Sequence, residues 1–85
     1  MNIENELTKR LQAAFAPKRL EVVNDSHKHA GHGGDDGSGE SHFSVLIRAE
    51  AFATMSRVAR PRAVHLAIGD LNQRIHALAV DVAGP

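Results

Sequence analysis

Apolar positions recur with two different periods along this chain, one typical of helices and the other of strands. From residue 2 to residue 15, apolar side chains recur every four positions, which is the spacing of one helix face. These side chains are Ile3, Leu7, Leu11 and Phe15. Asn2 is a residue type that caps helix N-termini, and Pro17 cannot continue a helix. The pattern therefore predicts a helix over residues 2–15.

Three later stretches have the character of strands. Residues 19–24 and 41–49 alternate between apolar and polar positions, which indicates strands with one buried face. Residues 75–82 are apolar almost without interruption, so we expect a third strand that is well covered. The positions predicted to be buried in the first two strands are Leu20, Val22, Phe43, Val45 and Ile47.

Helical segments separate the second and third strands. We expect a short helical turn over residues 53–58 and a helix from Pro61 to about residue 73, although Gly69 inside it costs up to about 1 kcal/mol relative to Ala. The order is αββααβ, in which the first two strands pair antiparallel and the third, after a helical crossover, lies parallel to a neighbour. The predicted fold class is α+β, a three-stranded mixed sheet with helices on one face.

Residues 25–40 form the most unusual stretch of the chain. Five of the seven glycines and three histidines lie here, so the composition predicts a mobile loop rich in glycine and histidine. His29 and His32 are spaced so that two imidazoles in a loop can reach one metal ion. The alternative is that they are solvated histidines with no role in metal binding. His27 is expected to hydrogen-bond within the loop.

His76 is the second candidate for chemistry. It lies at the start of the third predicted strand, among apolar residues, where a polar side chain must be satisfied or useful. By the strand period it shares a face with Leu78 and the apolar positions that follow. The alternative is a histidine at the edge of the core that bonds to backbone. His42 and His65 are expected to be structural or exposed.

Composition excludes several classes of function. The 85 residues suffice for one domain, and a formal net charge of zero gives no global attraction to nucleic acid or membranes. There is no cysteine, so this chain forms no disulfide and supplies no thiolate ligand. No apolar run is long enough for a membrane span, and the N-terminus does not resemble a secretory signal, so we expect a cytoplasmic protein. No catalytic constellation is evident, and we expect no enzyme activity.

One stretch is locally basic. Arg57, Arg60 and Arg62 lie within six residues that include no acid, at the junction of two predicted helices. Such a place can hold phosphate groups through guanidinium groups and free helix N-terminal amides. The alternative is a solvated helix start.

Taken in order, these residues resemble the BolA family over nearly the whole chain. The matching segments are Val23-Asn24-Asp25-Ser26-His27 with His29, Ser41-His42-Phe43, Phe52 with Ser56-Arg57 and Arg60-Pro61-Arg62, and Ile75-His76-Ala77-Leu78. The resemblance implies a single BolA-like domain over residues 1–85, similar to class II K-homology folds. It also implies a heterodimer with a monothiol glutaredoxin in which the two proteins share a [2Fe–2S] cluster. The glutaredoxin would supply its cysteine and a bound glutathione.

On this resemblance, His76 and one loop residue would be the ligands from this chain. Alignment of the segment around Asn24 favours His29 as the loop ligand, with His32 as the runner-up. The expected function is that of a non-enzymatic accessory in iron–sulfur trafficking and iron homeostasis. Because only neutral imidazole binds a metal, such ligation should weaken in acid.

Two other functions stay open. Some family members are transcriptional regulators, and residues 53–73 would then bind DNA as a helix-turn-helix-like unit. Here Pro61 replaces a histidine usual in the family, Ala53-Thr54 replace a glycine position, and the Gly-x-x-Gly clamp of RNA-binding K-homology domains is missing. These departures affect the nucleic-acid surface and leave the expected ligands in place. The third possibility is a protein that docks on a partner without a metal.

Overall fold

The computed structural model describes residues 2–26 and 41–85. In chain order their elements are α1 (Ile3–Phe15), β1 (Arg19–Asn24), β2 (His42–Arg48), the 3₁₀ helix η2 (Glu50–Phe52), α2 (Ala59–Ile68), the 3₁₀ helix η3 (Gly69–Gln73) and β3 (Ala77–Ala83). β2 is the central strand, and it pairs antiparallel with β1 and parallel with β3. This arrangement confirms the predicted α+β class and the predicted pairing of all three strands.

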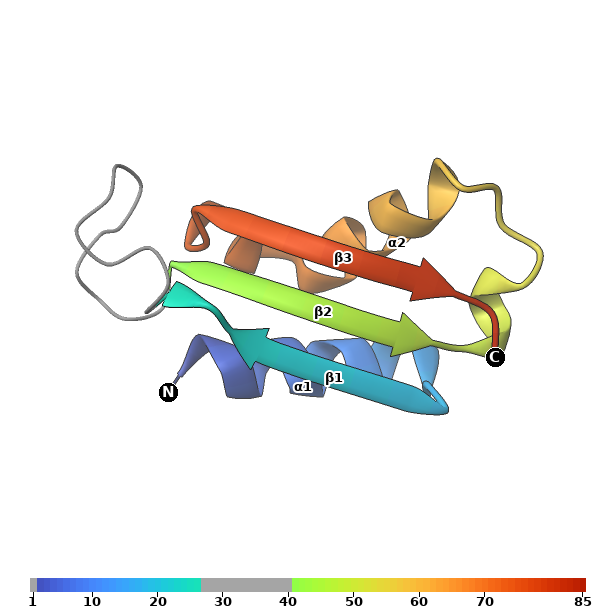
Figure 1. The fold of residues 1–85 in the computed structure, drawn as a ribbon, viewed down its shortest axis with the longest axis horizontal. Coiled ribbons are helices and arrows are strands. Elements are labelled where there is room, and N and C mark those ends of the chain that lie inside the picture. The colour runs from blue at the N-terminus through green and yellow to red at the C-terminus, as the bar shows by residue number, and fades with distance from the viewer. Residues whose placement is uncertain (1, 27–40) are drawn as a thin grey trace.

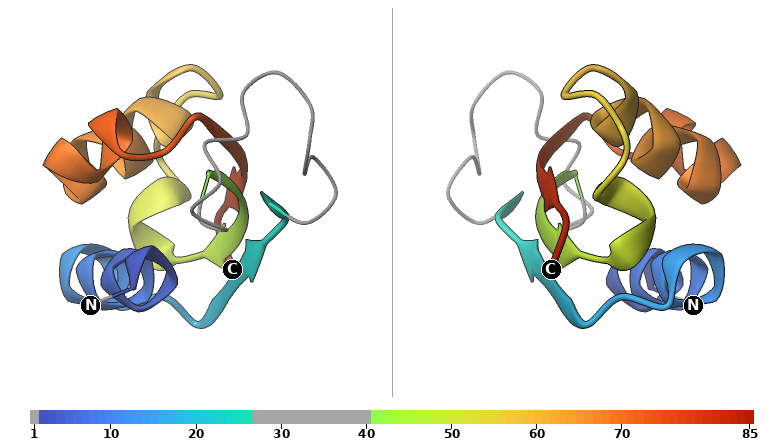
Figure 2. Two further views of the ribbon diagram at one scale, coloured as in Figure 1. Left: turned by 90° about the vertical axis from the view of Figure 1, so that its left-hand side faces the viewer. Right: turned by 90° about the vertical axis from the view of Figure 1, so that its right-hand side faces the viewer.

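α1 and α2 lie on the same face of the sheet, so the described part of the molecule has two layers (Figure 1). Figure 2 shows the two end-on views, in which both helices stand on one side of the strands. The core lies between the layers and consists of Ile3, Leu7, Leu11, Phe43, Val45, Ile47, Ala49, Phe52, Val64, Ile68, Leu71 and Ile75. Phe15 packs against Phe52 with ring centroids 4.6 Å apart. None of the helices in the described residues is long and apolar enough to cross a membrane.

α1 begins and ends as its sequence predicts. The backbone N–H of Asn5 donates to Oδ1 of Asn2 at 2.8 Å, which satisfies one of the helix amides that lack an internal partner. The helix ends at Ala16, whose φ of 44° lies in the left-handed region. That conformation costs an L-residue with a Cβ atom about 1 kcal/mol. Ala16 is therefore a strained cap, and Pro17 follows it.

The second half differs from the sequence prediction in its helices. The helical turn expected over residues 53–58 is found at Glu50–Phe52 instead, where buried Phe52 anchors it to the core. The single helix expected from Pro61 to residue 73 is two elements, because Gly69 has a φ of 54° and ends α2. Glycine adopts this backbone conformation without the steric cost that other residues meet. Gly69 is thus a boundary, where the sequence indicated only a weak point.

β3 is covered on one face only, and the expectation of a well-covered strand is wrong. Its exposure alternates, with Ala77, Ala79 and Asp81 exposed and the intervening residues half-buried. In the described residues, both α1 and α2 lie on the other side of the sheet (Figure 2). Alanine at two of the exposed positions accounts for the error, because it is apolar yet tolerates solvent well.

Candidate functional site

Segments that are distant in the sequence meet at one end of the sheet, the left-hand end in Figure 1. β1 ends where β2 begins, and the register pairs His42 of β2 with Ala77 of β3. His76 immediately precedes β3 and therefore lies at this end. The described chain leaves the same end at Ser26 and returns to it at Ser41. The sheet thus brings the flanks of residues 27–40 close to His76.

Three polar side chains are buried at this end, and they are the only buried polar or charged residues in the described part of the chain. Ser26, Ser41 and His42 have exposed fractions of 4%, 0% and 8%. The hydroxyl oxygen of Ser26 accepts hydrogen bonds from the backbone N–H of Ser41 at 2.8 Å and of His42 at 3.0 Å. A 2.9 Å hydrogen bond joins Oγ of Ser41 to Nδ1 of His42. We call these three residues the buried Ser–His cluster.

The buried Ser–His cluster holds the backbone at His76. The carbonyl oxygen of Ser41 accepts from the N–H of His76 at 2.9 Å and from the N–H of Ala77 at 3.1 Å. The His76 side chain is exposed, and its ring centroid lies 5.3 Å from that of His42. His76 is therefore an accessible imidazole on a fixed backbone, which is the arrangement that a ligand to an external group requires.

The structure corrects the sequence-based picture of His76 and agrees with that of His42 and His65. His76 lies just before the strand, not within its covered face, because its N–H and that of Ala77 share one carbonyl acceptor at Ser41. His42, expected to be structural or exposed, takes the structural role, since it is buried and hydrogen-bonded. His65 is exposed on α2, where its Nδ1 lies 2.7 Å from Oδ1 of Asn72.

The loop candidates cannot be placed against this site. His27, His29 and His32 lie outside the residues that the structure describes. Within residues 2–26 and 41–85, no three histidine or acidic side chains gather closely enough to hold a metal ion. His76 is therefore the candidate ligand whose surroundings are known, and it has no complete ligand set among its described neighbours.

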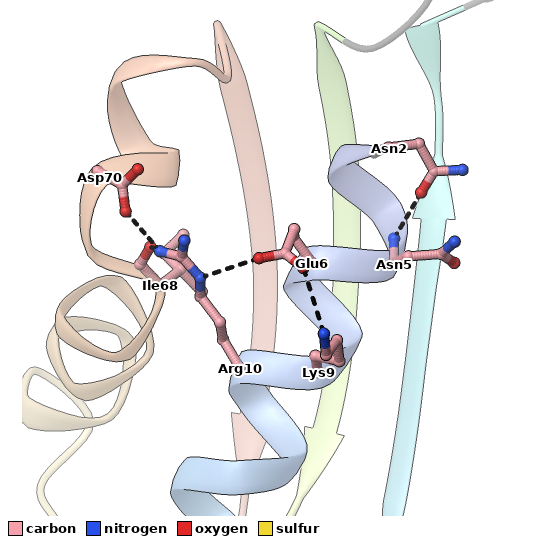
Figure 3. Close-up of polar contacts among 7 residues, drawn as sticks. All are labelled: Asn2, Asn5, Glu6, Lys9, Arg10, Ile68 and Asp70. Atoms are coloured by element: carbon pink, nitrogen blue, oxygen red, sulfur yellow. Dashed lines mark hydrogen bonds and ion pairs between the residues drawn. The ribbon is translucent and has the colours of Figure 1, made fainter.

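Arg10 of α1 fixes the segment that leads to His76. Its guanidinium donates at 2.6 Å to the carbonyl of Ile68, the last residue of α2, and at 2.6 Å to Oδ1 of Asp70 (Figure 3). The hydrogen bond and the positive charge of Arg10 lower the pKa of Asp70 below its ordinary value of 3.8. Because Gly69 lies between these two partners, Arg10 holds both sides of the break between α2 and η3.

The basic residues lie toward the far end of β3. Arg57 and Arg60 line a cleft of about 470 Å³ together with Pro61, Val80, Asp81 and Val82. Nε of Arg60 donates to the carbonyl of Phe52 at 3.0 Å, which fixes its direction. Arg62 is exposed and is not among the residues that line the cleft. Val82 is six residues from His76, about 20 Å at the rise of an extended strand, so the two candidate sites are separate.

The N-terminus of α2 offers fewer free amides than the sequence indicated. The N–H of Ala59 donates to Oγ of Ser56 at 3.1 Å, and the N–H of Arg60 donates to the Ser56 carbonyl, also at 3.1 Å. Pro61 has no N–H. Binding of an anion here would therefore rest on the arginine side chains.

Sequence reasoning missed the buried Ser–His cluster. Ser26 and Ser41 were treated as parts of a polar loop and a strand start, and neither was assigned a role. One usable signal existed, since short hydroxyl side chains at the two flanks of a long loop commonly bond to backbone amides. Their partners are 15 and 16 positions away, so no local pattern identifies them.

Comparison with known proteins agrees with the fold. A family model described as BolA-like protein matches residues 11–85. An uncharacterized protein in the cobS 5′ region of Sinorhizobium sp is 52% identical over an alignment of 87 positions, which covers 100% of this chain and 94% of that protein. The DNA-binding transcriptional regulator BolA of Vibrio cholerae is 39% identical over 79 residues, with 92% of this chain and 71% of the relative covered.

A solved structure shares the same architecture. BolA1 from Arabidopsis thaliana has a TM-score of 0.86 and 32% identity to this chain, and the match covers 100% of this chain and 94% of that one. The family match spans all three strands, α2 and the C-terminal part of α1 from residue 11 on. The chain therefore belongs to the BolA-like protein family.

Proposed function

We propose that this protein is a non-enzymatic accessory of iron–sulfur trafficking and iron homeostasis, which pairs with a monothiol glutaredoxin and shares a [2Fe–2S] cluster with it. The observation that carries this proposal is the state of His76. Its imidazole is exposed, while its backbone is held by the carbonyl of Ser41. An imidazole presented in this way suits a group that arrives from outside the chain.

The donor set fits a shared cluster and does not fit a cluster held by this chain alone. Iron–sulfur clusters are mainly bound by thiolates, and the sequence contains no cysteine. Imidazole is an accepted ligand where histidine replaces cysteine on one iron. We propose that His76 is one ligand from this chain and His29 the second, with His32 as the alternative to His29. The thiolates would come from the glutaredoxin and its bound glutathione.

The proposal is tested by mixing this protein with a monothiol glutaredoxin, glutathione, iron and sulfide. The heterodimer should have a visible absorption and circular dichroism spectrum that differs from that of the glutaredoxin homodimer. His76→Ala should abolish the difference, whereas His65→Ala, which alters an exposed histidine on α2, should preserve it. An identical spectrum with and without this protein would overturn the proposal.

The loop ligand is identified by single variants. His29→Ala should weaken retention of the cluster, and His32→Ala and His27→Ala should not. If His32→Ala has the larger effect, His32 replaces His29 in the assignment. If neither variant changes the spectrum or the loss of the cluster to a chelator, this chain contributes His76 alone.

A second function has support from a different observation. Arg57 and Arg60 line one cleft, and the family includes proteins named as DNA-binding transcriptional regulators. Against it stand the zero net charge and the presence of Asp81 in the same cleft. Retardation of duplex DNA in gels should fall steeply with salt and be lost in an Arg57→Glu/Arg62→Glu variant, since neither arginine has the Phe52 contact of Arg60.

Docking on a glutaredoxin without any cluster is the third possibility. Binding measured by calorimetry in the absence of iron separates it from the first. A His29→Ala/His76→Ala variant that binds as tightly as the wild type, with no cluster in the wild-type complex, would favour docking alone.

A further inference from the structure

The exposed ring of His76 lies against a ring that is buried and fixed. The two imidazole centroids are 5.3 Å apart, and the ring planes are inclined by 53°. His42 is 8% exposed, so one side of its ring is covered by the protein while its neighbour reaches solvent. The separation is within the range in which aromatic rings make favourable tilted contacts.

His42 is held from two directions. Its Nδ1 is joined to Oγ of Ser41 at 2.9 Å, and its backbone N–H donates to Oγ of Ser26 at 3.0 Å. Its carbonyl accepts from the N–H of Asp25 at 2.8 Å. Ring and backbone of His42 are thus both constrained, and the ring offers His76 a surface that does not move away.

Ser41 connects the two histidines. Its side chain binds the ring of His42, and its carbonyl binds the N–H of His76 at 2.9 Å. The same residue therefore sets the backbone of one histidine and the ring of the other. Because the backbone of His76 is held and its ring lies against a fixed ring, its side chain loses part of its rotamer entropy before it binds a metal.

We propose that His42 is a positioning residue for His76: with its backbone fixed by Ser26 and its ring fixed by Ser41, it holds the His76 imidazole in the orientation that binds the group shared with a partner. This inference rests on the proposed function for the nature of that group. Residues that orient a metal-binding imidazole typically change affinity about 10- to 100-fold when they are replaced. The geometry of the ring pair itself is independent of any cluster.

The first test uses the protein without a partner. In NMR spectra, wild-type His76 should show cross-relaxation between its ring protons and those of His42, and χ1 couplings of a single rotamer. Ser41→Ala keeps both rings and the carbonyl but removes the Oγ–Nδ1 bond, so the χ1 couplings of His76 should become averaged. His42→Phe keeps a ring without the Nδ1 bond and is the second variant. Rotamer-averaged couplings in the wild type would overturn the inference.

The second test uses the cluster-loaded heterodimer with a monothiol glutaredoxin. Ser41→Ala and His42→Phe should lose the cluster to a chelator about 10-fold faster than the wild type. Ile68→Val, a variant of the hydrophobic core, and His65→Phe should match the wild type. His42 does not position His76 if the rate of cluster loss simply follows the free energy of unfolding across all four variants. The same conclusion follows if the rate is unchanged in Ser41→Ala and His42→Phe.

The two tests separate the failure of this inference from that of the proposed function. If His76 is ordered in the wild type but no cluster-loaded heterodimer forms, the ring pair is confirmed and the proposed function is wrong. If the heterodimer has the expected spectrum, but Ser41→Ala and His42→Phe do not change the rate of cluster loss to a chelator, the inference is wrong and the proposed function is supported.

Discussion

Ser26 Oγ lies 2.8 Å from the backbone nitrogen of Ser41, and this bond closes the described chain across residues 27–40. The same oxygen also accepts from the N–H of His42 at 3.0 Å. One buried hydroxyl thus joins the end of β1 to the start of β2. The carbonyl of Ser41 in turn accepts from the N–H of His76. The position of the candidate ligand His76 therefore depends on the hydrogen bond between Ser26 and Ser41.

Ser26→Ala removes one oxygen atom but should destabilise the protein strongly. Two buried amides would lose their acceptor, at about 1–3 kcal/mol each. We expect the free energy of unfolding in urea to fall by about 2 kcal/mol or more. Ser56→Ala is the matched control, because the Ser56 hydroxyl accepts from the N–H of Ala59 at an exposed position. Equal losses in the two variants would contradict the importance of the buried contact.

Gly69→Ala should destabilise the protein, although alanine is the better helix former. The φ of 54° at Gly69 is unfavourable for a residue with a Cβ atom, at a cost of about 1–3 kcal/mol. A Cβ here would make only an ordinary contact, 3.7 Å from Nη1 of Arg10, so conformation and not space decides. Thermal and urea unfolding measure the change. A neutral or stabilising effect would show that the break between α2 and η3 is not required.

Ala16→Gly should have the opposite sign. Ala16 has a φ of 44° at the C-terminal cap of α1, where glycine is the preferred residue. Removing the Cβ should stabilise the protein by up to about 1 kcal/mol, because the native strain exceeds the added entropy of the unfolded chain. The midpoint of urea unfolding should rise. A lower midpoint would indicate that the alanine is not strained there.

Asp70→Asn should alter the acid limb of the stability curve. Arg10 lowers the pKa of Asp70 from 3.8, so the folded state favours the ionised form. That stabilisation is present in full above the ordinary pKa and is lost as the pH falls through the lower pKa of the folded protein. The wild type should therefore exceed Asp70→Asn in stability at neutral pH and converge with it in strong acid. A difference that grows in acid would have the wrong sign for this ion pair.

Much of the fold is encoded locally. The four-residue spacing of Ile3, Leu7 and Leu11 predicts α1, and the alternation in residues 19–24 and 41–49 predicts β1 and β2 nearly to the residue. The crossover argument also predicts that β3 lies parallel to a neighbouring strand, which is β2 in the structure. These features follow from periods that a single segment carries.

Other features depend on contacts between distant segments. Which face of β3 is covered depends on where the helices pack, and Ala79 is compatible with either environment. The burial of His42 accompanies contacts with Ser26, whose hydroxyl accepts from backbone amides across residues 27–40, and with Ser41, whose hydroxyl bonds to the His42 ring. For Gly69 the sequence predicts only a cost to the helix relative to Ala. Its φ of 54° belongs to the turn between α2 and η3, which Arg10 of α1 contacts at Ile68.

The central claim is that the imidazole of His76 binds a cluster shared with a monothiol glutaredoxin. The most direct test is pulsed electron paramagnetic resonance of the reduced heterodimer, prepared with this chain ¹⁵N-labelled at histidine and an unlabelled glutaredoxin. We predict strong hyperfine couplings from two histidine ¹⁵N nuclei, of which the one from His76 disappears in His76→Ala, whereas both persist in His65→Ala. A cluster-loaded heterodimer without such couplings, or one in which His76→Ala leaves the couplings unchanged, would contradict the account.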